Sequence, residues 1–124
     1  KRHLIAKKYD HFFKDFEGIT VQKQQENSYS SFHLYIILVD EKYSETRKIL
    51  FEKYRNEGIL VNVHYIPIYR QPFYSNNFNK KNFPNSEKYY RGAISLPIFP
   101  DLKEKDLQKV MRVFSKPQNF QNLF

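Results

Sequence analysis

Hydrophobic residues recur at helical spacing in three parts of the chain, and these parts are expected to form its long helices. The first helix should end at Gly18, and the second should begin at a Ser44 cap and run to about Asn56, with Gly58 as its stop. The third should follow Asp101, which with Glu104 resembles a capping box. The residues expected to face inward are Ile5, Tyr9, Phe12, Phe13 and Phe16, then Leu50, Phe51 and Tyr54, and finally Leu107, Val110, Met111 and Phe114.

Four apolar stretches between these helices predict strands. Phe32 to Val39 is the strongest, because both of its alternating sets are largely apolar, as in a central strand covered on both faces. Ile59 to His64 alternates, so Ile59, Val61 and Val63 should face the core. Shorter strands are expected at Ile19 to Lys23 and Ala93 to Leu96.

The order strand, helix, strand resembles a βαβ unit. The strands Phe32 to Val39 and Ile59 to His64 are therefore expected to be parallel neighbours. A short helix should follow Pro84, capped by Asn85, running through Arg91 and ended by Gly92.

These elements predict an α+β fold, with a small sheet of three or four strands covered mainly by two or three helices. At 124 residues the chain is expected to be one domain, spanning residues 1–124. The first helix has no cap before it, which suggests a fragment of a longer protein. Pro117 should end the last helix, leaving residues 118–124 as a frayed tail.

Composition narrows the classes of protein. With 40% hydrophobic and 18% aromatic residues, the chain is expected to fold around a core rich in rings. It has no cysteine, so disulfides and thiolate chemistry are excluded. No apolar run approaches the roughly 20 residues of a membrane span, and the N-terminus does not resemble a signal peptide, so a soluble, cytoplasmic protein without a membrane partner is expected.

The formal net charge of +8 has two interpretations. It would suit an anionic ligand, including single-stranded nucleic acid bound by a basic module rich in aromatic residues. It could also reflect the abundance of lysine and asparagine that AT-rich coding produces. The lysines are spread along the chain rather than clustered, so specific nucleic-acid binding is not expected.

Motifs of self-contained active sites are missing from the sequence. The four histidines show no metal-ligand spacing, and there is no Walker loop, GxGxxG or GxSxG motif. His33 is expected to be packed or hydrogen-bonded at the start of its strand, and Asp40 and Glu41 to form a turn. No metal site and no catalytic residue are predicted within this chain.

Candidate binding residues lie where the Ile59 to His64 stretch leaves the sheet. Pro67 should end strand pairing there, which places four polar side chains on an exit loop. Such side chains can stack on a base, share hydrogen bonds and pair with a phosphate, as a sugar nucleotide requires. They could equally be half-buried core tyrosines and a solvated arginine. The four candidates are His64, Tyr65, Tyr69 and Arg70.

Three segments resemble the C-terminal part of the DegT/DnrJ/StrS-type sugar aminotransferases. The resemblance covers nearly the whole chain. Its residues are His64, Tyr65, Pro67, Gln71 and Tyr74 in HYIPIYRQPFY, then Pro84, Glu87 and ISLPIFPDL from Ile94 to Leu102, together with SSFHLYII from Ser30 to Ile37.

This resemblance implies the small C-terminal domain of a pyridoxal-phosphate (PLP) enzyme of the aspartate-aminotransferase fold. It implies a homodimeric parent that uses glutamate as amino donor, and it is strongest to the subgroup that aminates a UDP-linked 4-keto-6-deoxy sugar for pseudaminic acid biosynthesis. In the family the Schiff-base lysine and most of the phosphate site lie in a large N-terminal domain, so no lysine of this chain is assigned that role and no cofactor is expected on this chain alone.

The resemblance implies that this domain closes one wall of the substrate cleft. His64 and Tyr65 would contact the sugar nucleotide, with Tyr69 and Arg70 as weaker candidates. Ser31 and His33 are possible wall residues, whereas Ser95 would shape the domain. A non-catalytic assembly domain with the same fold is the remaining alternative.

Overall fold

The computed structural model describes residues 1–115, without the side chains of residues 44–46 and 115. This part of the chain forms a three-stranded antiparallel sheet and five α-helices, as the expected α+β class requires. The elements in chain order are α1 (Arg2–Phe13), β1 (Ile19–Val21), β2 (Tyr35–Val39), η1 (Glu41–Tyr43), α2 (Ser44–Asn56), η2 (Ile68–Arg70), α3 (Pro72–Ser75), η3 (Lys80–Asn82), α4 (Pro84–Gly92), β3 (Ala93–Leu96) and α5 (Glu104–Ser115), where η marks a 3-10 turn.

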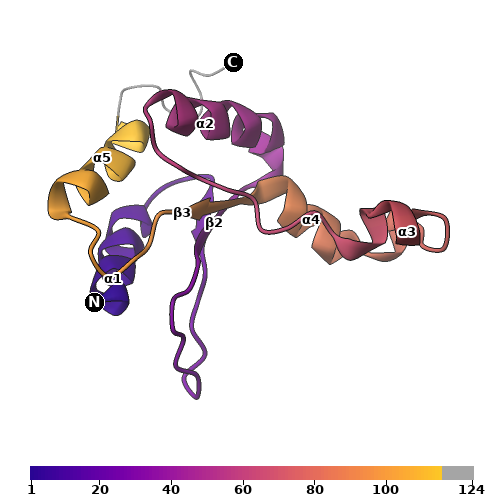
Figure 1. The fold of residues 1–124 in the computed structure, drawn as a ribbon, viewed down its shortest axis with the longest axis horizontal. Helices are drawn as coiled ribbons and strands as arrows, with labels where there is room; N and C mark the ends of the chain where they lie inside the picture. Colours follow the sequence, from indigo (N-terminus) through magenta and orange to yellow (C-terminus); the bar gives the residue numbers. More distant parts are fainter. Residues whose placement is uncertain (116–124) are drawn as a thin grey trace.

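Three helices enclose the main core together with the sheet. Helices α1 and α2 pack against strands of the sheet, and α5 packs against both of these helices (Figure 1). The periodicity predicted their inward faces correctly: Ile5, Tyr9 and Phe13, then Leu50 and Tyr54, and then Leu107, Val110, Met111 and Phe114 are buried. The Phe114 ring lies 4.9 Å from that of Phe13 and 5.6 Å from that of Tyr54, so the core is rich in rings, as expected.

Strand β2 is central, as its apolar pattern predicts, because β1 and β3 pair with its two edges. Tyr35, Ile37 and Val39 are buried, while the alternate residues are half-buried. The strand begins at Tyr35 rather than Phe32, because Phe32 has a φ of 45°, which extended backbone does not allow. His33 is exposed and lies before the strand, so it is not packed at the strand start, which was one of the two roles expected for it.

Residues 59–64 are not a parallel neighbour of β2, as the βαβ pattern had suggested. The neighbouring strand is β3, which runs antiparallel with Tyr35 opposite Leu96. Residues 59–64 instead make one isolated antiparallel bridge, between Asn62 and Ser95 of β3. The predicted alternation holds nevertheless, since Ile59 and Val61 are buried while Leu60 is 75% exposed.

The predicted end of α1 at Gly18 is wrong, because α1 ends at Phe13 and Gly18, with a φ of 80°, lies in the turn before β1. Gly58 does follow the end of α2, and its φ of 71° suits glycine after a helix. Gly92 does not act in this way, since it is the last residue of α4 and is buried beside Val39. Its role is close approach between a helix and a strand rather than termination.

Three predicted helix starts are shifted by one to three residues. Helix α2 has Tyr43 rather than Ser44 at the N-cap position. Helix α4 begins at Pro84, with Phe83 rather than Asn85 at the N-cap, because the fixed φ of proline suits the first helical position. Helix α5 begins at Glu104, so Asp101 is too far upstream to form the expected capping box.

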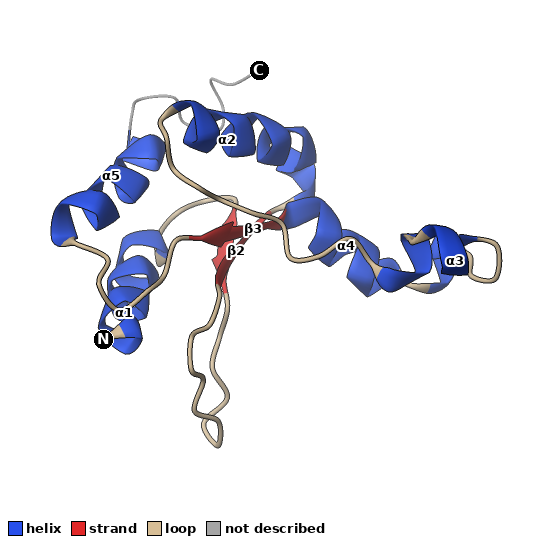
Figure 2. Ribbon diagram, viewed as in Figure 1, coloured by secondary structure: helices blue, strands red, loops and turns tan. Residues whose placement is uncertain are grey.

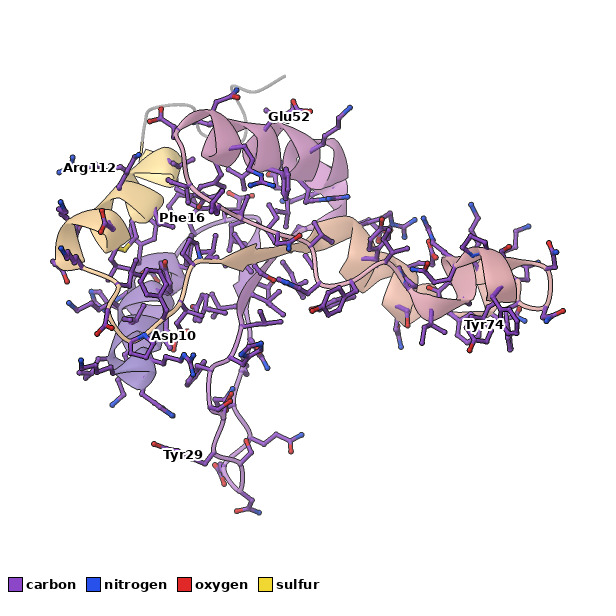
Figure 3. The ribbon with its side chains drawn as sticks, in the orientation of Figure 1. Asp10, Phe16, Tyr29, Glu52, Tyr74 and Arg112 are labelled. Carbon is purple, nitrogen blue, oxygen red and sulfur yellow. The ribbon has the colours of Figure 1, made fainter. Side chains whose placement is uncertain are left out.

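Two segments extend from the compact body. The connection from β1 to β2 forms a long loop that carries Tyr29, and the segment from η2 to η3 carries α3 and Tyr74 away from the sheet (Figures 2 and 3). No helix among the described residues is long and apolar enough to cross a bilayer. The expected end at Pro117 and the tail 118–124 lie outside the described residues.

Candidate functional site

The four candidate residues follow the Asn62–Ser95 bridge. Asn62 and Ser95 exchange two backbone hydrogen bonds, of 3.3 Å from the Asn62 N–H and 2.8 Å from the Ser95 N–H. This pair holds the end of residues 59–64 against the edge of β3. The chain beyond it leaves the sheet, as the sequence predicts, and enters η2.

His64 is held by a side chain of the sheet. Its Nδ1 atom lies 2.8 Å from the Oγ atom of Ser95, which is only 5% exposed. Because Nδ1 is occupied in this way, Nε2 is the ring nitrogen left to contact another molecule, as donor or acceptor according to the tautomer. Ser95 therefore orients His64.

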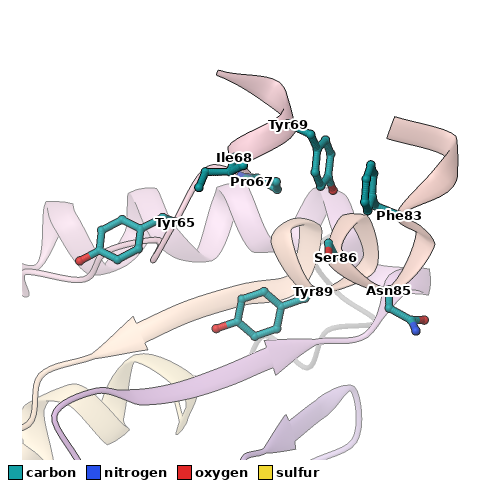
Figure 4. Close-up of a pocket in the computed structure, with 8 residues that line it drawn as sticks. All are labelled: Tyr65, Pro67, Ile68, Tyr69, Phe83, Asn85, Ser86 and Tyr89. Carbon is teal, nitrogen blue, oxygen red and sulfur yellow. The ribbon is translucent and has the colours of Figure 1, made fainter. Parts of the chain in front are cut away.

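Tyr65 lies at one end of an open groove of about 590 Å³ between η2 and α4. Its side chain is 75% exposed and its ring meets the His64 ring edge to face at 4.7 Å. Figure 4 shows its hydroxyl directed away from the other lining side chains. The groove is lined by Tyr65, Pro67, Ile68, Tyr69, Phe83, Asn85, Ser86 and Tyr89.

Tyr69 and Arg70 both donate hydrogen bonds to Glu87 of α4. The Tyr69 hydroxyl donates to Glu87 Oε1 at 3.0 Å, and Arg70 donates from Nε to the same oxygen at 2.8 Å. Arg70 Nη2 also donates to Glu87 Oε2. Hydrogen bonds from Arg70 hold the pKa of the Glu87 carboxyl below its usual value, although burial opposes them, so Glu87 is charged at neutral pH.

The structure thus divides the four candidates into two pairs. His64 and Tyr65 present a ring nitrogen and a hydroxyl, while Tyr69 contributes the face of its ring to the groove and Arg70 is engaged in an ion pair. Sequence reasoning assigned no role to Glu87 and only a shaping role to Ser95. Neither could have been paired with its partner from local pattern, because the contacts join residues 17 and 31 positions apart. Ser31 and His33 are exposed and do not line the groove.

The groove does not fit PLP by itself. A lysine amine is needed for the Schiff base, and the groove is lined by no lysine and no carboxylate. The described residues also contain no cluster of His, Asp and Glu that could hold a metal ion. What the groove offers is aromatic surface with hydroxyl and amide groups, which suits binding rather than acid–base chemistry.

Comparisons with a family model and with individual known proteins both point to aminotransferases. The DegT/DnrJ/EryC1/StrS aminotransferase family matches the chain over residues 1–115. The UDP-4-amino-4,6-dideoxy-N-acetyl-beta-L-altrosamine transaminase of Helicobacter pylori is 36% identical over 110 residues, which are 89% of this chain and 29% of the relative.

Solved structures agree with this match. Helicobacter pylori PseC, an aminotransferase involved in the biosynthesis of pseudoaminic acid, superposes with a TM-score of 0.83 and 33% identity over 97% of this chain and 32% of its own. The PLP form of the putative sugar aminotransferase Spr1654 from Streptococcus pneumoniae gives a TM-score of 0.85 and 26% identity, over 99% and 31% respectively. The chain spans about 30% of the length of the relatives it matches.

Proposed function

Because the chain belongs to the DegT/DnrJ/EryC1/StrS aminotransferase family, we propose that it forms the small C-terminal domain of a PLP-dependent nucleotide-sugar aminotransferase. The parent enzyme transfers an amino group from glutamate to a UDP-linked 4-keto-6-deoxy sugar, works as a cytoplasmic homodimer and serves a pathway of the pseudaminic acid type. The observation that carries the proposal is the likeness to a transaminase and to PseC over about nine tenths of this chain or more.

The chemistry is divided between this domain and a larger one. PLP supplies an electron sink when bound. Its lysine and phosphate site belong to sequence outside these residues, since the groove of this chain does not fit the cofactor. This domain supplies a wall of the substrate cleft.

His64 and Tyr65 are the substrate contacts in this proposal. The Ser95 hydroxyl at Nδ1 keeps the His64 ring in one orientation, with Nε2 free to hydrogen-bond the nucleotide sugar. Tyr65 offers a phenol and an exposed ring for stacking. Tyr69 lines the groove with its ring, and Arg70 retains N–H donors that Glu87 does not use.

Exposed apolar side chains support a role within a larger protein. Between positions 60 and 78, seven large hydrophobic residues each expose more than a third of their surface to solvent. Exposed apolar side chains in such number are typical of a surface that another part of a protein covers. These residues are Leu60, Tyr65, Ile66, Ile68, Phe73, Tyr74 and Phe78.

The test compares the isolated chain with the longer enzyme that carries it. Each is mixed with PLP, glutamate and a UDP-linked 4-keto-6-deoxy-N-acetylhexosamine, and the aminated sugar is measured. We expect turnover by the longer enzyme only. Specific turnover by the isolated chain, or a longer enzyme that aminates no nucleotide sugar, contradicts the proposal.

Substitutions test the assigned contacts within the longer enzyme. His64→Ala and Tyr65→Ala should each lower kcat/KM by about tenfold or more, since each removes a substrate contact. Tyr29→Ala is the matched control, because Tyr29 is 88% exposed but neither lines the groove nor belongs to the apolar stretch between positions 60 and 78. An equal fall in kcat/KM for the control variant would contradict the assignment of His64 and Tyr65 as substrate contacts.

A further inference from the structure

One wall of the groove is built from a turn that lies outside the main core. Residues Ile68 to Arg70 form η2, and Tyr69, only 8% exposed, stacks on Phe83 with ring centres 4.3 Å apart and planes inclined by 10°. Figure 4 shows these two rings face to face beside the start of α4. The position of η2 against α4 therefore determines the width of the groove.

A single carboxylate joins this turn to the helix. Glu87 is 7% exposed and accepts three hydrogen bonds from two consecutive residues of η2, one from Tyr69 and two from Arg70. The Arg70 guanidinium also lies over the Tyr90 ring, 5.0 Å from its centre. Both residues that the Arg70 guanidinium contacts, Glu87 and Tyr90, thus belong to α4.

The other ion pairs of the described residues are more exposed than this one. The Glu41 carboxylate that accepts from Arg91 of the same helix has a side chain 55% exposed, against 9% for Glu87. Exposed pairs contribute little. The Arg70–Glu87 pair is only partly buried, because the Arg70 side chain is 35% exposed, but the Glu87 carboxylate also accepts from the Tyr69 hydroxyl, so its loss removes three hydrogen bonds to η2 at once. Glu87 is thus the ion-pair residue whose loss is expected to release a structural element.

We propose that Glu87 is a positioning residue of the substrate groove, acting through Tyr69 and Arg70. Glu87 does not touch substrate. Its carboxylate holds η2 in the position where Tyr69 lines the groove. It thereby also fixes the C-terminal end of the short segment that follows Tyr65. Ser95 fixes the near end through His64, so residues 65–68 are held between two anchors. This inference rests on the proposed function for its substrate, a nucleotide sugar.

The kinetic signature follows from the chemistry of the groove. Its lining residues hold no charged acid or base, and the reacting group would lie on a cofactor that this groove does not fit, so we expect them to bind the substrate to a similar extent in the ground state and in the transition state. Displacing these lining residues should therefore weaken binding of the nucleotide sugar without slowing the chemical step. In the longer enzyme, Glu87→Gln should raise KM for the nucleotide sugar by about tenfold or more, while kcat changes by less than about twofold.

The matched control is Glu41→Gln, the same substitution in an exposed pair to α4, which should leave both parameters unchanged. Tyr69→Phe removes one of the three hydrogen bonds but keeps the stacked ring, so its KM should lie between those of the wild type and Glu87→Gln. An unchanged KM in Glu87→Gln, or a kcat lowered to the same extent as kcat/KM, overturns the inference.

A second measurement needs no turnover. Two turn hydrogen bonds report on η2, from the Arg70 N–H to the Pro67 carbonyl at 2.9 Å and from the Gln71 N–H to the Ile68 carbonyl at 3.0 Å. In the 124-residue chain, Glu87→Gln should speed hydrogen exchange at these two amides at least about tenfold and leave the amides of α5 unchanged. Unchanged exchange at Arg70 and Gln71 overturns the inference.

The two measurements separate the inference from the proposed function. If the longer enzyme aminates no nucleotide sugar but Glu87→Gln still releases the two amides, the proposed function fails and the anchoring role of Glu87 stands. If the enzyme is active and Glu87→Gln changes neither KM nor exchange, the inference fails and the proposed function stands.

Discussion

Three buried tyrosines of the core use their hydroxyl groups differently. The Tyr9 hydroxyl donates to the Pro97 carbonyl at 2.9 Å, and the Tyr35 hydroxyl donates to Asp10 at 2.7 Å. The Tyr54 hydroxyl is buried and has no hydrogen-bond partner among the described residues. Burial raises the pKa of all three phenols, so each remains neutral at physiological pH.

This difference predicts opposite effects for the same substitution. Tyr9→Phe should destabilise the chain by about 1 kcal/mol, because the Pro97 carbonyl loses its donor. Tyr54→Phe should leave the stability unchanged or raise it by up to about 1 kcal/mol, because it removes a buried hydroxyl that has no partner. Urea unfolding of both variants beside the wild type measures the two changes. A loss at Tyr54 equal to that at Tyr9 would show that its hydroxyl is bonded.

At the scale of elements, the close approach of α4 to β2 determines where Glu87 lies. The approach occurs at Gly92, where a Cβ atom would stand 2.5 Å from the carbonyl oxygen of Val39. Backbone cannot yield as a flexible side chain does, so only glycine allows this spacing. The same helix carries Glu87 near its start, which means that Gly92 helps to place the groove.

Gly92→Ala is therefore expected to destabilise the chain by about 2–3 kcal/mol through overpacking. Lys88→Ala, at an exposed position of the same helix, is the control and should change the stability by less than about 0.5 kcal/mol. Thermal or urea unfolding of both variants provides the comparison. A Gly92→Ala variant as stable as the control would mean that α4 and β2 can separate without cost.

At the scale of the whole molecule, the charge is large but dispersed. The formal net charge is +8, and cations such as Lys1, Lys8, Lys42 and Arg91 are paired with exposed carboxylates. Seven of the twelve exposed large hydrophobic side chains of the described residues lie instead between positions 60 and 78, and those of Ile68, Phe73, Tyr74 and Phe78 belong to the segment from η2 to η3 that extends from the body. This arrangement favours contact with another protein surface over recognition of a polyanion.

The isolated chain should therefore bind single-stranded oligonucleotides weakly and without sequence preference. Fluorescence titration with two labelled oligonucleotides of different sequence, repeated over a salt series, measures this binding. We expect dissociation constants above about 10 µM at physiological salt that weaken further as salt rises, as for nonspecific charge neutralisation. Tight binding that distinguishes the two sequences would support a nucleic-acid module instead.

Local periodicity was enough to determine the helical faces and several boundaries. The inward residues of α5, the end of α2 and the bounds of β3 agree with the structure, because side-chain spacing and burial are set within each element. The family likeness was also visible in short segments such as HYIPIYRQPFY. The substrate contacts assigned to His64 and Tyr65 remain predictions.

Only the tertiary structure decided which segments pair. Residues 59–64 have the alternation of a strand, but β3 takes the edge of β2 that the βαβ pattern assigned to them. The hydrogen bond between Ser95 and His64 and the one from Arg70 to Glu87 likewise join residues that no local pattern connects. The sequence alone determined where polar groups leave the sheet. Packing decided which of these groups stay available for a ligand, because strand pairing and ion pairs form between elements that are distant in the sequence.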